Sequence, residues 1–218
     1  MRNAGMTMEE IMHLNSFQKK GFLLGGSELR VGNVFTLTIY NSYFKNLMDR
    51  FPRVRGGDVH LFNVIYDAND VYETRNDVRE RFTTLFARPE YNRQLTNQAL
   101  VTTENGAIFM ENAIIIGVTQ VIKSNQVNKN HPLMTGKYLV ENSLLVLGDY
   151  IFYGSSEDPN TPFVRANSEP ILPFSWTTIS GLPYTNYRLI NVNQLESYLN
   201  QAGLGAGHKN IDYLKLNY

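Results

Sequence analysis

The chain reads Thr36-Leu37-Thr38-Ile39-Tyr40-Asn41-Ser42-Tyr43-Phe44 and then, with its asparagine 22 residues further on, Val59-His60-Leu61-Phe62-Asn63-Val64-Ile65-Tyr66. In both stretches a strand-like alternation leads into an asparagine, and large apolar residues follow it. Asparagine suits a sharp bend because it tolerates left-handed backbone angles and bonds to neighbouring backbone. The pattern predicts strand, bend, strand.

The same pattern returns in Ala107–Ile115, around Asn112, and in Tyr138–Leu145, around Asn142. The intervals between the four asparagines are 22, 49 and 30 residues, so the longer two leave room for inserted loops. Strand spacing alone fits a β-sandwich as well as a parallel β-solenoid. The asparagine register favours the solenoid, in which stacked asparagines can bond along the column.

Between the first two strand units lies the run Arg50-Phe51-Pro52-Arg53-Val54-Arg55-Gly56-Gly57. Pro52 fixes one backbone angle and makes Phe51 extended. Arg53 and Arg55 then point to one side, and Arg50, before the bend, can converge on the same spot. Such guanidinium groups suit a planar anion, a carboxylate or a phosphate. Clustered arginines are, however, more often a solvated face or ion-pair partners than a site.

These residues resemble the signature of the family 1 polysaccharide lyases, the pectate lyases. The resemblance rests on two stretches of sequence. The first is R-x-P-x-x-R-G-G, preceded by Y-F-K-N and followed by V-H-x-[aromatic]-N-x-x-Y. The second is the run Lys20–Ser27, which is similar to K-x-x-L-x-G-S. Matched position by position, the resemblance places Arg50 on the catalytic arginine, and Arg55 and Lys20 on substrate-binding residues. We count Arg53 with the substrate-binding residues.

The resemblance implies an all-β fold, a right-handed parallel β-helix (solenoid) with an irregular C-terminal segment and a short helix. Residues 1–218 would form one such domain, truncated at its N-terminal end. The implied reaction is β-elimination on polygalacturonate (pectin), with Arg50 as the base, in a secreted monomer.

The family also implies Ca²⁺, held by acidic residues that precede the lysine. Only Glu9, Glu10 and Glu28 lie at or before that region here, and none matches the family's ligands. Calcium takes six to eight oxygen ligands, so no metal ligand is assigned from this sequence. We therefore expect the chain to correspond to the C-terminal part of a pectate lyase.

Composition excludes several other classes of protein. The net charge of zero gives no electrostatic reason to expect nucleic acid or a membrane surface as partner. No apolar stretch approaches the roughly 20 residues that span a bilayer, and Met1–Phe17 lacks the apolar core of a signal peptide. The histidines have no metal-ligand spacing, and His60 is expected to be structural.

Other segments carry simpler expectations. Asp67–Leu100 is predicted to be a polar loop with one helical turn, and Ser124–Leu133 and Ser155–Ser168 are predicted loops. The aromatic residues of Pro173–Trp176 and Pro183–Tyr184 are expected on the outside of the coils. Val192–Ala202 is predicted to be an amphipathic helix that ends at Gly203.

A second hypothesis remains open at this stage. A non-catalytic carbohydrate-binding β-solenoid would keep the basic groove without the calcium half of the site. A structural solenoid, such as a phage or adhesion module, is a third and weaker hypothesis.

Overall fold

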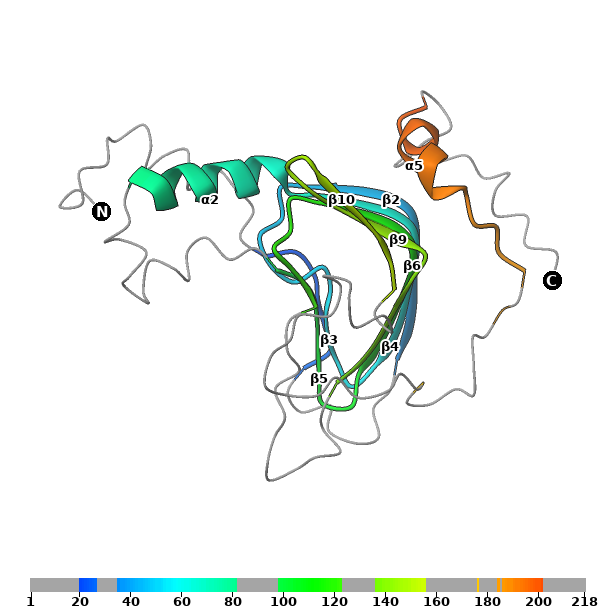
Figure 1. Cartoon of the computed structure of the whole chain (residues 1–218). Helices are drawn as coiled ribbons and strands as arrows, with labels where there is room; N and C mark the ends of the chain where they lie inside the picture. Colours follow the sequence, from blue (N-terminus) through cyan, green and yellow to red (C-terminus); the bar gives the residue numbers. More distant parts are fainter. Residues whose placement is uncertain are drawn as a thin grey trace.

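Two parallel sheets form the framework of the protein in a computed structural model (Figure 1). The structure describes residues 20–26, 35–81, 98–122, 136–155, 176, 184 and 186–201. The four-stranded sheet has the order β1 (Leu23–Leu24), β3 (Arg53–Arg55), β5 (Gln98–Thr103) and β7 (Gln120–Ile122). From β1 to β8, successive strands along the chain alternate between the two sheets, so the strands of each sheet follow one another in sequence order.

The second sheet has six strands. They are β2 (Thr36–Lys45), β4 (Asp58–Asp67), β6 (Ala107–Ile116), β8 (Lys137–Glu141), β9 (Ser143–Leu147) and β10 (Tyr150–Gly154). Strands β2, β4 and β6 pair in parallel, and β8 and β9 both continue on β6. Strand β10 alone turns back and pairs antiparallel with β9. The four strand units predicted from the asparagine pattern are thus confirmed, whereas β5, β7 and β10 were not predicted.

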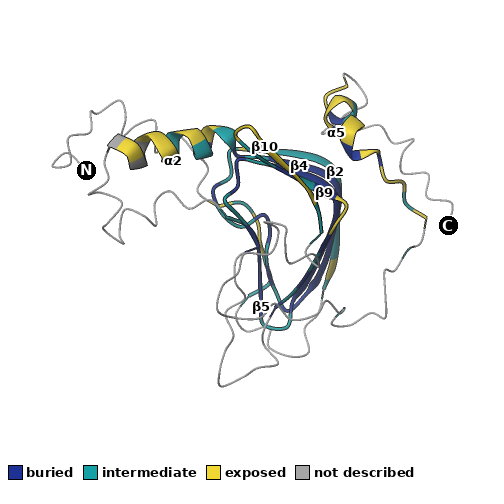
Figure 2. Ribbon diagram, in the orientation of Figure 1, coloured by how far each residue is buried: buried dark blue, intermediate teal, exposed yellow. Residues whose placement is uncertain are grey.

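The core lies between the two sheets, and strand β4 is buried along nearly its whole length (Figure 2). Val54 of β3 and Leu61 of β4 are fully buried, as are Ile108 and Met110 of β6. The residues of β2 at the sheet edge are mostly half-buried. Apolar side chains from successive strands therefore stack into one continuous core, which each strand unit could not bury alone.

The predicted column of asparagines is present. Asn41, Asn63, Asn112 and Asn142 have positive φ angles of 47°, 50°, 53° and 43°. Each side-chain amide donates to the oxygen of the preceding asparagine, over 3.0 Å from Asn63 to Asn41, 2.6 Å from Asn112 to Asn63 and 3.1 Å from Asn142 to Asn112. These residues bend the strands at one level and tie them together along the stack.

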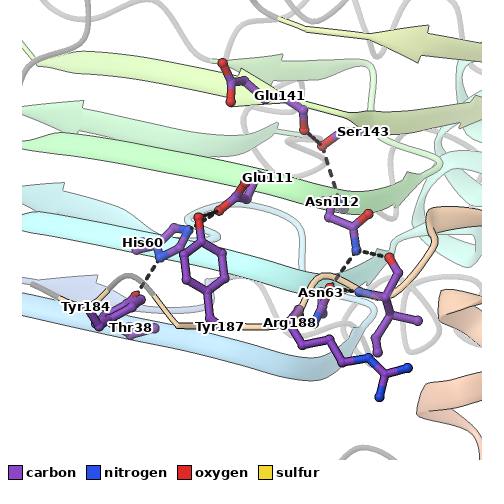
Figure 3. Close-up of polar contacts among 12 residues, drawn as sticks. Thr38, His60, Asn63, Glu111, Asn112, Glu141, Ser143, Tyr184, Tyr187 and Arg188 are labelled. Carbon is purple, nitrogen blue, oxygen red and sulfur yellow. Dashed lines mark hydrogen bonds and ion pairs between the residues drawn. The ribbon is translucent and has the colours of Figure 1, made fainter. Parts of the chain in front are cut away.

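The C-terminal segment binds to this column from outside (Figure 3). The amide of Asn63 donates to the carbonyl oxygen of Arg188 over 2.8 Å, and that of Asn112 donates to Ile190 over 2.5 Å. The backbone N–H of Ile190 in turn donates to Asn63 Oδ1 over 3.0 Å. The ladder thus anchors the segment that leads into the last helix.

Aromatic residues of the same segment cover the outer face of the six-stranded sheet (Figure 3). His60 is 2 % exposed; its Nδ1 lies 2.6 Å from the hydroxyl of Tyr184 and its Nε2 lies 2.8 Å from Glu111 Oε1. Tyr187 also donates to Glu111, and burial together with that contact raises the pKa of Tyr187 well above its usual range. These contacts place His60 in a packed polar cluster, and they place Tyr184 on the outside of the coils as expected.

Two helices are described, and both correct the predicted bounds. Helix α2 (Asn69–Arg81) is a full helix of 13 residues that points away from the sheets, where only one helical turn was expected (Figure 1). Its first turn is capped by Asp67 Oδ1, which accepts from the backbone N–H of Asn69 over 3.0 Å. Val71 near its start is fully buried, but most of its other residues are polar, so the apolar periodicity that reveals most helices is missing.

Helix α5 (Val192–Leu199) buries Val192, Leu195 and Leu199 against the six-stranded sheet, as the spacing predicts. It ends at Leu199 with Asn200 as its C-cap, so the predicted end at Gly203 is wrong. The predicted loops within 124–133 and 156–168 lie outside the described residues, as do 1–17 and Pro173. No described helix has the length and apolar character that crossing a membrane requires.

Asn112→Ala should lower the free energy of unfolding by about 3 kcal/mol, because a buried amide with three partners is lost and two of those partners, Asn63 and Ile190, stay buried. Asn142→Ala is the matched control: it also has a positive φ, but it is exposed at the end of the ladder, so we expect a loss of about 1 kcal/mol. Urea unfolding measures both. Equal losses would contradict a ladder that depends on its buried members.

Candidate functional site: an arginine cluster on the four-stranded sheet

Strand β3 presents two arginines on one face, as the alternation predicts. Val54 is fully buried in the core, while Arg53 and Arg55 on either side of it are half-buried and point outward. Strand β3 lies between β1 and β5, with Arg53 aligned to Leu23 on one side and to Val101 on the other. The two guanidinium groups therefore sit on a surface that is held from both sides.

Arg50 lies in the turn that leads into β3, and its backbone is held by two neighbouring strands. It has a φ of 65°, in the left-handed region. Its carbonyl oxygen accepts from the N–H of Phe22 over 2.8 Å, and the next N–H, of Phe51, donates to Ala99 over 2.8 Å. Phe51 is fully buried and stacks on Tyr66 with ring centres 4.5 Å apart. The Phe51–Pro52 peptide is cis.

Lys20 reaches the same region from the neighbouring coil. The next residue, Gly21, donates its N–H to the carbonyl oxygen of Asp49 over 2.9 Å. Lys20 is exposed, next to the turn that contains Arg50. A glycine is needed at position 21, because a Cβ there would lie 2.6 Å from the Arg50 carbonyl oxygen. The four cations that the sequence singled out thus come from adjacent strands and turns.

The electrostatics of the cluster favour an anion. Burial lowers the pKa of Arg53 from its usual value, and the positive charges of Arg55 and Arg50 lower it further. Two carboxylates offset part of this charge: Asp49 Oδ2 lies 3.9 Å from Arg50 Nε, and Glu104 Oε2 lies 3.6 Å from Arg55 Nε. The Nε atoms of all three arginines are buried, and none of them donates a hydrogen bond to a described residue.

Sequence reasoning missed the residues that complete the site from later strands. Glu104 and Asn105 form the turn after β5, beside Arg55, and Lys137 Nζ donates to Asn105 Oδ1 over 2.8 Å. The arginine motif does not predict Glu104 or Asn105, since Glu104 lies 49 positions beyond Arg55 in the sequence. Asp58, the acid that directly follows the arginine motif, is instead buried at the start of β4 with 1 % exposure.

The described residues do not form a calcium site. Among them no group of three or more His, Cys, Asp or Glu side chains is placed to hold a metal ion. Asp49 and Glu104, the acids beside the arginines, each face an arginine instead. Calcium needs several oxygen ligands in one shell, and the described part of the site does not offer them.

Comparison with known proteins identifies the family. The sequence model of the pectate lyase family matches residues 12–143, more than half of the chain, including the strands that hold the arginines. The chain belongs to the pectate lyase family. It is 30% identical to pectate lyase B of Paenibacillus amylolyticus over 112 residues, which are 51% of this chain and 29% of that protein.

A solved pectate lyase shares the fold of nearly the whole chain. The structure of pectate lyase PelN from Paenibacillus sp. 0602 superposes with a TM-score of 0.82 at 27% identity and covers 99% of this chain. That match covers 49% of PelN, so the chain spans about half the length of this pectate lyase and less of pectate lyase B.

Gly21→Ala should disturb the arginine turn specifically, since the new Cβ would push the Arg50 carbonyl away from the N–H of Phe22. We expect amide hydrogen exchange at Phe22 to speed up about tenfold or more, the result of losing roughly 1.4 kcal/mol of local protection. Gly148→Ala is the control: a Cβ there meets no atom within 4 Å, and the strain from its φ of 57° stays in the turn between β9 and β10 of the other sheet, so exchange at Phe22 should not change. Unchanged exchange at Phe22 in Gly21→Ala would contradict the close approach.

Proposed function

We propose that this chain forms the substrate-binding and catalytic face of a pectate lyase that cleaves polygalacturonate by β-elimination. The observation that carries the proposal is the cluster of Arg50, Arg53 and Arg55, whose buried Nε atoms donate no hydrogen bond to described residues. Guanidinium groups held in this way suit the carboxylates of a uronic acid chain. Membership of the pectate lyase family supports the same substrate class.

We further propose that residues 1–218 form a single right-handed parallel β-helix. The strands alternate between two parallel sheets, and the asparagine ladder marks the same bend in successive coils. The superposition on PelN supports this assignment. By the same family argument, we propose that the protein acts outside the cell.

In the proposed reaction a base removes the proton on carbon 5 of a galacturonate unit. The electrons of that C–H bond form the double bond between carbons 4 and 5, and the glycosidic bond from carbon 4 to oxygen breaks. The leaving oxygen takes up a proton. Arg50 is assigned as the base, and Arg53, Arg55 and Lys20 neutralise the carboxylates of the bound chain. Positive charge next to the carboxylate on carbon 5 stabilises the carbanion that develops.

An arginine base is chemically demanding, because free arginine keeps its proton up to about pH 12 or above. Neighbouring positive charge and burial both favour the deprotonated form. The lowered pKa of Arg53, which has these two causes, supports such an environment at the centre of the cluster.

Calcium remains a proposal that rests on the family resemblance. Because the described residues gather no calcium ligands, no step of the reaction is assigned to the metal. Ligands for Ca²⁺ would have to lie outside the residues that the structure describes.

A second candidate function is a carbohydrate-binding solenoid that grips polygalacturonate without cleaving it. The observation that favours it is the same lack of a carboxylate cluster among the described residues near the arginines. Retention on polygalacturonate with no unsaturated product from a folded sample would support it. Failure to bind at low salt would contradict it.

Arg50→Ala should reduce the release of 4,5-unsaturated product from polygalacturonate by at least about 100-fold, the usual contribution of a general base. The product is followed by its ultraviolet absorbance. Arg188→Ala serves as the control, because it removes an exposed arginine from the C-terminal segment, which lies on the outer face of the other sheet, without touching the cluster. Activity of Arg50→Ala equal to that of the unaltered protein would overturn the catalytic assignment.

Adding a calcium chelator should abolish product formation, because the family resemblance implies a requirement for Ca²⁺. The same absorbance assay measures it, with Ca²⁺ added back in excess as the control. Product formed at the same rate with and without chelator would show that calcium is not required.

A further inference from the structure

We propose that Glu104 is a built-in competitor for the substrate carboxylate: it faces Arg55 in the free protein and is displaced when a uronate carboxylate binds there. This inference rests on the proposed function and adds a residue that sets the affinity for unesterified sugar. Glu104 was not among the predicted site residues.

The first support is position. Arg55 in β3 aligns with Thr103 at the end of β5, so the residue after Thr103 lies beside the guanidinium group. Glu104 Oε2 is 3.6 Å from Arg55 Nε, and the two side chains are only 17% and 23% exposed. A carboxylate of this chain therefore faces the group that the bound sugar's carboxylate would approach.

The second support is that the contact is incomplete. A distance of 3.6 Å is an ion pair but too long for a hydrogen bond. Both Arg55 Nε and Glu104 Oε2 are buried and make no hydrogen bond with described residues. A paired, planar carboxylate would satisfy the guanidinium better than Glu104 does, so an incoming uronate can displace it.

The third support is the backbone that carries Glu104. Glu104 and Asn105 have positive φ angles of 55° and 63°, and they form the turn between β5 and β6. Asparagine commonly adopts this left-handed backbone conformation, whereas a glutamate there is uncommon and costs about 1 kcal/mol. The turn therefore tolerates a less favourable residue whose side chain faces the arginine, which points to a role in the site.

Competition of this kind acts on only one form of pectin. A free carboxylate competes with Glu104 for Arg55, whereas a methyl-esterified unit is neutral and leaves the contact between Glu104 and Arg55 in place. Glu104 thus lowers affinity for the free acid and has little effect on affinity for the ester. Removing its charge should strengthen binding of the free acid and leave binding of the ester nearly unchanged.

The test is calorimetric binding of a defined oligogalacturonate, with its fully methyl-esterified form alongside, at low salt. Glu104→Gln should bind the free acid about tenfold more tightly, the order expected for removing one nearby like charge. Its affinity for the ester should change less than about twofold. Glu196→Gln, which removes an equal charge from the exposed face of α5, should change neither affinity.

Two further variants separate competition from a change in folding. Glu104→Asn keeps a residue suited to the turn and should also tighten binding of the free acid. In an Arg55→Ala background, Glu104→Gln should have no effect beyond about twofold, because its partner is gone. Tightening that persists without Arg55 would contradict the proposed competition.

The outcomes distinguish this inference from the function on which it rests. If the unaltered protein binds the oligogalacturonate and Glu104→Gln binds it equally or more weakly, the competition is wrong and the proposed substrate stands. If neither the unaltered protein nor the Glu104 variants bind it, the proposed function is wrong and the inference falls with it.

Discussion

The bond from one asparagine side chain to the next is the interaction on which the rest of this structure depends. Each asparagine bends the chain at a left-handed backbone angle, and each one after Asn41 also donates to the asparagine before it. Both demands are met only when the strands stack in one register. Their oxygens and amides also receive the C-terminal segment at Arg188 and Ile190, so the ladder holds the coils and their outer cover together.

The register that the ladder imposes also builds the arginine site. Because strands stack in parallel, the turn that contains Arg50 meets Gly21 from the coil before it, and Arg55 meets the Glu104 turn from the coil after it. Arg53 lies between the two other arginines, where burial and like charge act on the same guanidinium. The core beneath β3 fixes the backbone, so the guanidinium groups stay close together despite their like charge.

Local patterns could be predicted from the sequence, whereas contacts between distant segments could not. Arg53 and Arg55 were predicted on one face because alternation is a property of a single extended chain. The Asn41 and Asn63 bends were predicted because the residue type and its neighbours suffice. Helix α2 was underestimated because its sequence is mostly polar, with Val71 as a core residue near its start. Strand β5 was missed because its sequence, QALVTT, carries no asparagine bend of the kind that marked the other strand units.

The sequence by itself determined the strand units, their asparagine bends and the candidate cations Lys20, Arg50, Arg53 and Arg55, since each is recognised from residues close together in the chain. Only the tertiary structure decided what faces those cations. Glu104 meets Arg55 across 49 positions of sequence, and His60 is buried by residues more than 100 positions away. Such contacts depend on the stacking register, which is the sum of many weak packing and hydrogen-bond energies spread over the whole core.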